Sequence, residues 1–355
     1  MITDPRVFDD EYLPRELKYR EGPVEELCRA FDPAVDGNEA TDVLVAGPSG
    51  VGKTVLVRHT LGRLEQYANV DHAHIDCLGV NTEEVLREAL YQHRRPVDID
   101  SDASIDSLRN ELEATLAQPY ILVLDEADAL PDAEILDDVI DIPGVSIVAI
   151  CHDQERWLAR LSDDVRRQIA APVRLGRYGM DELASILRDR ADQGLRRGAV
   201  DDEQLRTIAD EVAGVARFGI QALRAAAEFA SDRGHGQIEE IDVEDSFERA
   251  RRRIRRSSLN SLPFHHHVLY GLIHQAGKLS ASTLHEQYEE LAEDLYFGRD
   301  LTPIGGRARR NKLSKLREYD LIGYQGPPQN RWYYVLDETI EAPVSVPVLN
   351  QQAAE

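Results

Sequence analysis

Apolar and polar positions follow three different patterns along the chain. Short, mainly apolar runs at 42–46, 121–124 and 145–153 lie between stretches of helical periodicity, which is typical of buried parallel strands that alternate with helices. From 176 to 258 apolar residues recur at helical spacing, which predicts helices outside the sheet. Beyond 259 three helical stretches precede two short aromatic-rich runs, and the Gly-Pro-Pro-Gln-Asn sequence between these runs predicts a β-hairpin.

These patterns predict three domains of different architecture. We expect residues 1–175 to form an α/β domain, with a parallel sheet and flanking helices, and residues 176–258 to form an α-helical lid. We expect residues 259–340 to form a winged helix-turn-helix, followed by a tail at 341–355. A chain of 355 residues is long enough for two or three domains.

Composition adds information about habitat and compartment. The chain has 65 acidic residues against 41 basic ones, a formal net charge of −24, and only five of those 41 cations are lysine. A surface rich in carboxylates and poor in lysine indicates a halophilic source, because such a surface stays soluble in concentrated salt. The sequence shows no apolar leader, no apolar run near 18 residues and no CxxC pair, which together predict a cytoplasmic protein with reduced cysteines.

The positive charge is concentrated in one part of the chain. Residues 249–317 hold 14 basic and six acidic residues, a net charge of +8, which leaves −32 for the remainder. Six of these cations are arginines within the sequence RARRRIRR at 249–256. The asymmetry predicts a basic module on an acidic body. For the arginine run itself, a solvated face and contact with a DNA backbone both remain open.

A phosphate-binding loop is indicated at 42–54, where the sequence is DVLVAGPSGVGKT. The motif GxxxxGKT follows a strand and precedes a helix, the context in which glycines let backbone N–H groups point at phosphate oxygens. Lys53 is expected to reach the outer phosphates, and Thr54 to hold Mg²⁺. The residues predicted to contact nucleotide are Gly47, Pro48, Ser49, Gly50, Val51, Gly52, Lys53, Thr54 and Val55.

The sequence YILVLDEADAL at 120–130 supplies the second half of such a site. Asp125 emerges at the carboxyl end of a buried strand, where it is placed to hold Mg²⁺ through water. Glu126 is placed to polarise an attacking water, which indicates hydrolysis and disfavours a nucleoside kinase. The alternative is a pair of acids that cap the next helix.

Two further candidates for the hydrolysis site follow downstream. His152 ends the third strand and is expected to offer a polar side chain to the terminal phosphate; a simple strand-end histidine is the alternative. Arg166 is the candidate arginine finger towards a neighbouring subunit, with Arg167 as the other choice. Surface ion pairs with Asp163 and Asp164 are the alternative for both arginines.

From Val7 to about Leu336 the chain resembles the archaeal DNA replication initiators, relatives of the eukaryotic origin recognition complex and its helicase loader. Members of that family are AAA+ ATPases with a C-terminal winged helix. Besides the phosphate loop, the resemblance rests on VFDDEYLPRELKYREGPVEEL, HIDCLGVNTEEVLREAL, LDEADAL, YGMDELASILRDRA and GVARFGIQALRAAAEFA. This sequence departs from the family pattern at His152, where the family has asparagine, and at Val215, where it has aspartate.

The resemblance implies a set of ligands and roles. It places Tyr178 and Arg190 near the nucleotide and assigns Arg217 as the sensor-2 arginine. It implies ATP or ADP with Mg²⁺ as cofactors and double-stranded origin DNA as a partner. It also implies contact with the replicative helicase and with other initiator subunits.

The predicted third helix of the C-terminal module is strongly basic. A basic helix in this position suits the major groove of DNA and its flanking phosphates, and the hairpin suits the minor groove or the backbone. A winged helix that contacts proteins is the alternative. The residues predicted to contact DNA are Arg307, Arg309, Arg310, Lys312, Lys315 and, in the hairpin, Arg331.

Taken together, these features predict an origin-binding protein of DNA replication initiation in which ATP binding and hydrolysis act as a conformational switch. The alternative is a DNA-binding regulator that holds nucleotide with little or no turnover.

Overall fold

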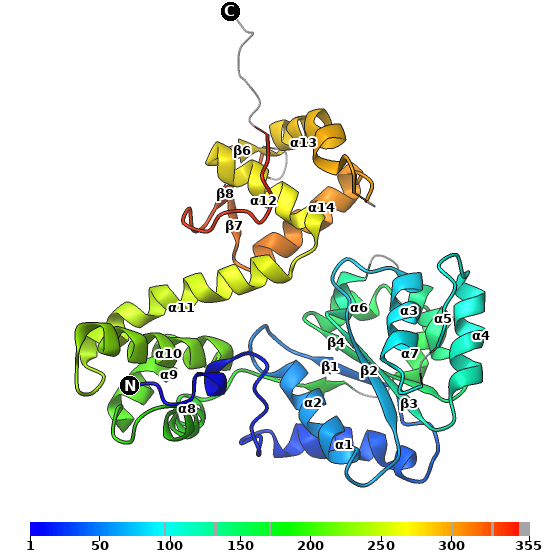
Figure 1. The fold of residues 1–355 in the computed structure, drawn as a ribbon, viewed down its shortest axis with the longest axis horizontal. Helices are drawn as coiled ribbons and strands as arrows, with labels where there is room; N and C mark the ends of the chain where they lie inside the picture. The colour runs from blue at the N-terminus through cyan, green and yellow to red at the C-terminus, as the bar shows by residue number, and fades with distance from the viewer. Residues whose placement is uncertain (96, 131–133, 170–171, 300, 328–329, 348–355) are drawn as a thin grey trace, which may run out of the picture. The chain divides into compact units, whose positions relative to one another are not determined.

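The computed structural model describes residues 1–95, 97–130, 134–169, 172–299, 301–327 and 330–347 (Figure 1). The chain divides into two compact units, Met1–Phe247 and Glu248–Glu355. Across the described ranges, no helix is both long enough and apolar enough to cross a membrane.

A five-stranded parallel sheet organises the first unit, with the strand order β2-β3-β4-β1-β5. The three predicted strands, β1, β3 and β4, form the centre of this sheet, and β2 and β5 are its edge strands. The strands are β1 (Val43–Ala46), β2 (Asp71–Asp76), β3 (Tyr120–Asp125), β4 (Val145–Cys151) and β5 (Val173–Arg174).

Helices cover both faces of this sheet, because successive residues of each central strand point to opposite sides. In β3, Ile121 and Val123 pack against α1 and α2, whereas Leu122 and Leu124 pack against α3 to α7 (Figure 1). The helices are α1 (Glu21–Val35), α2 (Lys53–Leu64), α3 (Thr82–Gln92), α4 (Ile105–Thr115), α5 (Glu134–Ile140), α6 (Gln154–Leu158) and α7 (Asp163–Gln168), with the 3₁₀ turn η2 (Ala127–Ala129) after β3.

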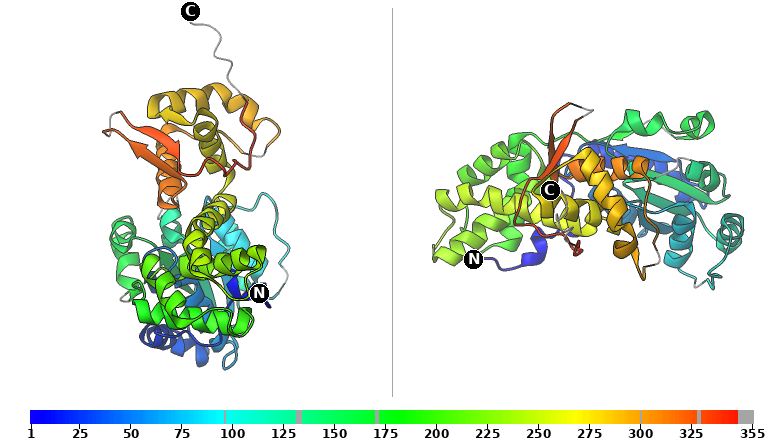
Figure 2. Two further views of the ribbon diagram at one scale, coloured as in Figure 1. Left: turned by 90° about the vertical axis from the view of Figure 1, so that its left-hand side faces the viewer. Right: turned by 90° about the horizontal axis from the view of Figure 1, so that it is seen from above.

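Three helices form the lid that follows the sheet: α8 (Met180–Gly194), α9 (Asp202–Glu211) and α10 (Ala216–Arg233) (Figures 1 and 2). The chain bends between α9 and α10 at Gly214, whose φ of 76° is in the left-handed region. A side chain there would also lie 2.1 Å from the carbonyl oxygen of Tyr178, so only glycine fits. Four alanines of α10 are fully buried: Ala222, Ala225, Ala226 and Ala230.

The N-terminal segment lies on the lid. Its 3₁₀ turn η1 (Pro5–Phe8) buries Val7 and Phe8 against α8 and α10. A side chain at Gly194 would lie 2.6 Å from the Phe8 ring, so the ring fills the space that this glycine leaves. The lid is followed by α11 (Glu240–Ser261), a long helix that continues into the second unit.

The second unit has the element order of a winged helix: α12, β6, α13, α14 and then a hairpin of β7 and β8. Its antiparallel sheet has the order β6-β8-β7, and β6 was not predicted from the sequence. Two leucines of its third helix, Leu313 and Leu316, are buried. The hairpin turn lies partly outside the described residues. The elements are α12 (Phe264–Ala276), β6 (Lys278–Ser280), α13 (Ala281–Tyr296), α14 (Gly306–Glu318), β7 (Ile322–Gln325) and β8 (Trp332–Val335).

Candidate functional site

The loop between β1 and α2 has a backbone that suits an anion. Gly50 and Gly52 have φ values of 73° and 95°, in the left-handed region that favours glycine. A side chain added at Gly52 would meet no atom within 4 Å, so open space lies over the start of α2. No side chain caps that helix, which leaves its first N–H groups for a ligand. The loop therefore fits phosphate.

Lys53 turns back over this loop. Its Nζ donates to the carbonyl oxygens of Gly47 at 2.8 Å and Pro48 at 3.0 Å. Burial lowers the pKa of Lys53, and the nearby carboxylates of Glu126 and Asp125 partly oppose that shift. The ammonium group thus lies among the loop carbonyls, next to the space above α2.

Thr54 and Asp125 come together as the two motifs require. The Thr54 hydroxyl donates to Asp125 Oδ2 at 2.7 Å, and His74 Nε2 lies 3.0 Å from the same oxygen. Burial alone raises the pKa of Asp125, but the hydrogen bonds from His74 and Thr54 outweigh it and hold the pKa below its ordinary value. An anionic carboxylate beside a hydroxyl is a donor set that fits Mg²⁺.

Glu126 follows Asp125 at the end of β3 in an unusual backbone conformation. Its φ of 56° is in the left-handed region, which costs free energy for a residue with a long side chain. Its N–H donates to Asp125 Oδ1 at 3.0 Å. On the neighbouring strand, the His152 N–H lies 3.4 Å from Asp128 Oδ2. Three predicted residues and Asp128 therefore lie together at the carboxyl ends of β3 and β4. The three predicted residues are Asp125, Glu126 and His152.

The candidate arginine fingers are bound within their own segment. Arg166 donates to the carbonyl oxygens of Leu158 and Leu161, both at 3.2 Å, and lies 3.5 Å from Asp163. Arg167 pairs with Asp164. The ion pairs of the alternative interpretation are therefore present, and they engage both guanidinium groups.

The lid touches the phosphate loop through Arg217. Its backbone N–H donates to the Gly50 carbonyl at 3.1 Å. Its guanidinium pairs with the carboxylate of Asp10, with Nη2–Oδ2 at 2.6 Å and Nε–Oδ1 at 3.2 Å. Val215 is the N-cap residue of α10 and makes no side-chain capping bond there.

Tyr178 is held by an arginine that sequence reasoning missed. Arg20 is buried, its guanidinium stacks 3.8 Å from the centre of the Tyr178 ring, and its Nε donates to the Tyr178 hydroxyl at 3.0 Å. Its Nη2 also donates to the Gly176 and Val51 carbonyls. Arg20 thus joins the phosphate loop to the start of the lid.

Arg190 is directed to the N-terminal segment. Its Nη1 donates to the Val7 carbonyl at 2.8 Å, and its guanidinium lies 4.2 Å from the centre of the Tyr12 ring. Burial lowers the pKa of Arg190. The segment that Arg190 holds is the same one that carries Asp10.

In the second unit, the basic residues of α14 do not share one face. Arg307 and Arg310 are exposed, whereas Arg309 is 5% exposed, bonds Glu289 at 2.6 Å and stacks on the Tyr288 ring. The helical periodicity explains the split, because Arg309 lies on the side of α14 that carries Leu313 and Leu316.

The other predicted DNA contacts also differ in exposure. Lys315 is buried and bonds Glu318 at 3.0 Å, and burial lowers the pKa of Lys312. Arg331 lies 4.8 Å from the centre of the Tyr324 ring, which Arg317 also contacts. Asn311, which the sequence did not single out, is exposed beside Arg310.

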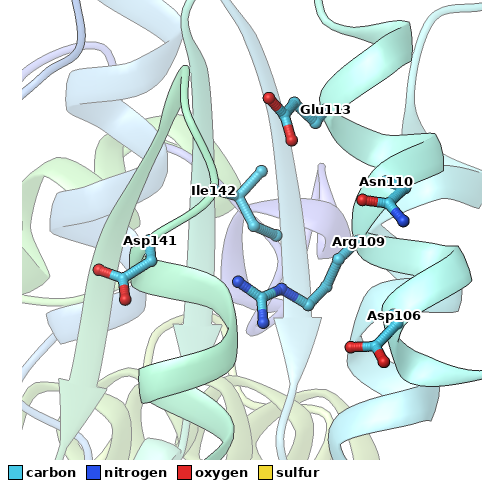
Figure 3. Close-up of a pocket in the computed structure, with 6 residues that line it drawn as sticks. All are labelled: Asp106, Arg109, Asn110, Glu113, Asp141 and Ile142. Atoms are coloured by element: carbon cyan, nitrogen blue, oxygen red, sulfur yellow. The ribbon is translucent and has the colours of Figure 1, made fainter.

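A separate polar pocket of about 410 Å³ lies between α4 and the α5–β4 loop (Figure 3). Its central cation, Arg109, lies 3.5 Å from Asp138. Two of its lining residues, Asp141 and Ile142, precede the amino-terminal end of β4, whereas the phosphate loop follows the carboxyl end of β1. Its lining is Asp106, Arg109, Asn110, Glu113, Asp141 and Ile142.

Two family models match the chain. The AAA ATPase domain model matches residues 16–137, and the Cdc6 AAA+ ATPase-type lid domain model matches residues 184–248. The ORC1-type DNA replication protein 9 of Halobacterium salinarum is 29% identical over 344 residues, which covers 96% of this chain and 95% of that protein. The chain is therefore similar, over nearly its whole length, to archaeal ORC1-type DNA replication proteins. The resemblance inferred from its motifs is thereby confirmed.

Further ORC1-type proteins are similar to this chain over most of their length. The ORC1-type DNA replication protein 1 of Halobacterium salinarum is 29% identical, covering 83% of this chain and 97% of that protein. The ORC1 protein of Aeropyrum pernix, solved in complex with DNA, is 22% identical, with 94% and 93% coverage and a TM-score of 0.70. At 22% identity this similarity supports a shared fold, and the matched region includes both units of the chain.

Proposed function

We propose that this chain is a nucleotide-switched, DNA-binding protein of replication initiation. Its family supports the general role, because its curated relatives are ORC1-type DNA replication proteins. One observation carries the switch: the Thr54–Asp125 pair lies under an open phosphate loop whose Gly50 is bonded to the lid at Arg217. Residues 1–175 would act as the ATPase base, 176–258 as the lid and 259–340 as the DNA reader.

ATP or ADP would bind at the loop, and Mg²⁺ would be held by Thr54 and, through water, by Asp125. The residues present fit both groups, since the loop N–H groups are open and Asp125 is held in its charged form. A related protein, the ORC2 protein of Aeropyrum pernix, is known in ADPNP–ADP complexes; it is 22% identical and has a TM-score of 0.63. Bound nucleotide supplies the negative charge that the lid arginine can detect.

Hydrolysis would depend on Glu126 as the base, with His152 beside it and Arg166 as the finger from a neighbouring subunit. The runner-up function is a DNA-binding regulator that holds nucleotide without turnover. The engagement of Arg166 by the carbonyls of Leu158 and Leu161 favours this runner-up, because a finger has to leave them. The two candidate functions differ only in the rate of ATP hydrolysis.

DNA binding would use the exposed face of α14, with Arg307 and Arg310 at its centre and Arg331 on the hairpin. The charge distribution supports this, since residues 249–317 carry +8 on a chain of −24. Arginine binds guanine and phosphate through two hydrogen bonds at once. Double-stranded origin DNA is the proposed ligand, and the replicative helicase and other initiator subunits are the proposed protein partners.

Steady-state ATP hydrolysis by the full chain separates the two candidate functions. Turnover that Glu126→Gln abolishes, with nucleotide binding retained, supports the switch with hydrolysis. Nucleotide binding without turnover in the wild type supports the regulator. If the wild type binds nucleotide no better than Lys53→Ala, both candidate functions are rejected.

A further inference from the structure

The N-terminal segment presents two consecutive carboxylates to one face of the lid helix α10. Asp10 pairs with Arg217 through two hydrogen bonds, and Asp9 pairs with Arg224 at 3.0 Å. Arg217 and Arg224 are seven residues apart, so they lie on the same side of the helix two turns from each other. The first of these pairs adjoins the phosphate loop, because the Arg217 backbone is bonded to Gly50.

Arg217 is a residue of the lid that contacts the phosphate loop directly. Its backbone N–H is bonded to Gly50, and a side chain built at Gly50 would lie 3.2 Å from the Arg217 Cβ. The carboxylate on its guanidinium is therefore an anion held beside a loop that is built for anions. A carboxylate that binds arginine through two oxygens occupies the same fork of donors that a phosphate uses.

The Asp10–Arg217 pair is accessible. The Asp10 side chain is 43% exposed and that of Arg217 is 28% exposed. Exposed ion pairs contribute little to stability, so another anion can replace the carboxylate at small cost.

The segment that carries Asp10 has its own anchors. Phe8 is completely buried, its carbonyl accepts from Gln221 Nε2 at 2.7 Å, and the Val7 carbonyl accepts from Arg190. Glu11 pairs with Arg58 of α2 at 2.6 Å. The carboxylate of Asp10 therefore stays close to Arg217 even when their hydrogen bonds are broken, and its charge then repels a nearby phosphate.

We propose that Asp10 is a specificity-determining residue of the nucleotide site: its carboxylate competes with the terminal phosphate of a nucleoside triphosphate for Arg217. This inference rests on the proposed function of the loop. Its consequence is weaker binding of the triphosphate relative to the diphosphate, because the diphosphate lacks the phosphate group that would take the arginine. Asp10 thereby sets how much triphosphate is needed to engage the lid.

The test is the affinity of the full chain for fluorescent ATP and ADP analogues, in the wild type and in Asp10→Asn. Asn keeps the size of the side chain and removes its charge. We expect Asp10→Asn to tighten ATP binding about two- to fivefold, the range that an exposed ion pair supports, and to leave ADP binding nearly unchanged. The matched control is Asp9→Asn, which removes the pair with Arg224 and should change neither affinity.

Adding Arg217→Ala tests the route of the effect. With that arginine removed, Asp10→Asn should no longer alter the ratio of ATP to ADP affinity. Equal changes for both nucleotides, no change, or weaker ATP binding in Asp10→Asn would each overturn the inference while the wild type still binds nucleotide. A wild type that binds neither nucleotide would instead reject the proposed function of the loop, and the inference with it.

Discussion

The Thr54 hydroxyl donates a hydrogen bond to the Asp125 carboxylate at 2.7 Å, although 71 residues separate them in the sequence. The contact arises because β1 and β3 are parallel strands of one sheet, with β4 between them, so their carboxyl ends lie at the same edge. It brings the two halves of the proposed magnesium site together in the geometry that their separate motifs require.

Replacing this carboxylate tests the magnesium assignment. Asp125→Asn keeps an oxygen that accepts from Thr54 and removes the charge, so we expect the magnesium-dependent part of ATP binding to weaken by about tenfold or more. Titration calorimetry with magnesium and with a chelator measures it. The control is Asp76→Asn at the end of β2, which should bind like the wild type. Equal magnesium dependence in Asp125→Asn and the wild type would contradict the assignment.

Asp42 gives the first unit a predictable pH dependence. Burial raises the pKa of its carboxyl from 3.8 to about 6, so between these values the folded chain keeps a proton that the unfolded chain has released. The contribution of Asp42 to the free energy of unfolding therefore falls as pH rises through this window. Asp42→Asn retains the acceptor for the Ile147 N–H, which lies 2.6 Å from Asp42 Oδ1, and removes the charge.

Chemical denaturation at two pH values checks this effect. At pH 7 the Asp42→Asn variant should be more stable than the wild type by about 3 kcal/mol, the value of a shift of this size. Below pH 4 the two proteins should have the same free energy of unfolding. A difference that does not depend on pH would show that the charge of Asp42 is not its cause.

Neighbouring arginines of α14 should respond in opposite ways to mutation. Arg310 is exposed, so Arg310→Ala should weaken duplex binding by about 1–3 kcal/mol and leave the thermal midpoint unchanged. Arg309 is buried and bonded to Glu289, so Arg309→Ala should lower stability by about 1–3 kcal/mol. Fluorescence anisotropy and thermal unfolding on both variants measure the two effects. If Arg309→Ala weakened DNA binding and Arg310→Ala lowered only stability, the DNA-binding face would lie elsewhere on the second unit.

The uncapped start of α10 offers a stabilising substitution. Val215→Asp provides a side-chain acceptor at the N-cap and should raise stability by about 1 kcal/mol, because such residues satisfy the first helical N–H groups. Val215→Ala is the control, since it changes the apolar side chain without adding an acceptor. Thermal unfolding that ranks the aspartate variant below the alanine variant would contradict this.

The sequence predicted the sheet centre and the phosphate loop because both have local signals. The buried strands β3 and β4 are continuous apolar runs, and the loop has a fixed spacing of glycines before Lys53. The edge strand β2 has no such signal, since it mixes histidine and aspartate with apolar residues. The strands β5 and β6 have two and three residues, too few for any periodicity.

The residues that complete the site had no local signal. His74, Arg20 and Asp10 contact partners that are 51, 158 and 207 residues away in the sequence. Such pairs depend on the register of the sheet and on how the N-terminal segment lies on the lid. The exposed and buried arginines of α14 were predictable in principle, because the helical spacing of Leu313 and Leu316 indicates the inward face.

Duplex binding as a function of nucleotide tests the central claim most directly. An origin duplex and a scrambled duplex are titrated with the full chain in the presence of ATP, of ADP, or of neither, and Lys53→Ala is the control. The account predicts that the wild type prefers the origin duplex and that its affinity differs between ATP and ADP, whereas Lys53→Ala binds equally in all three conditions. No duplex binding by the wild type in any nucleotide state would contradict the account.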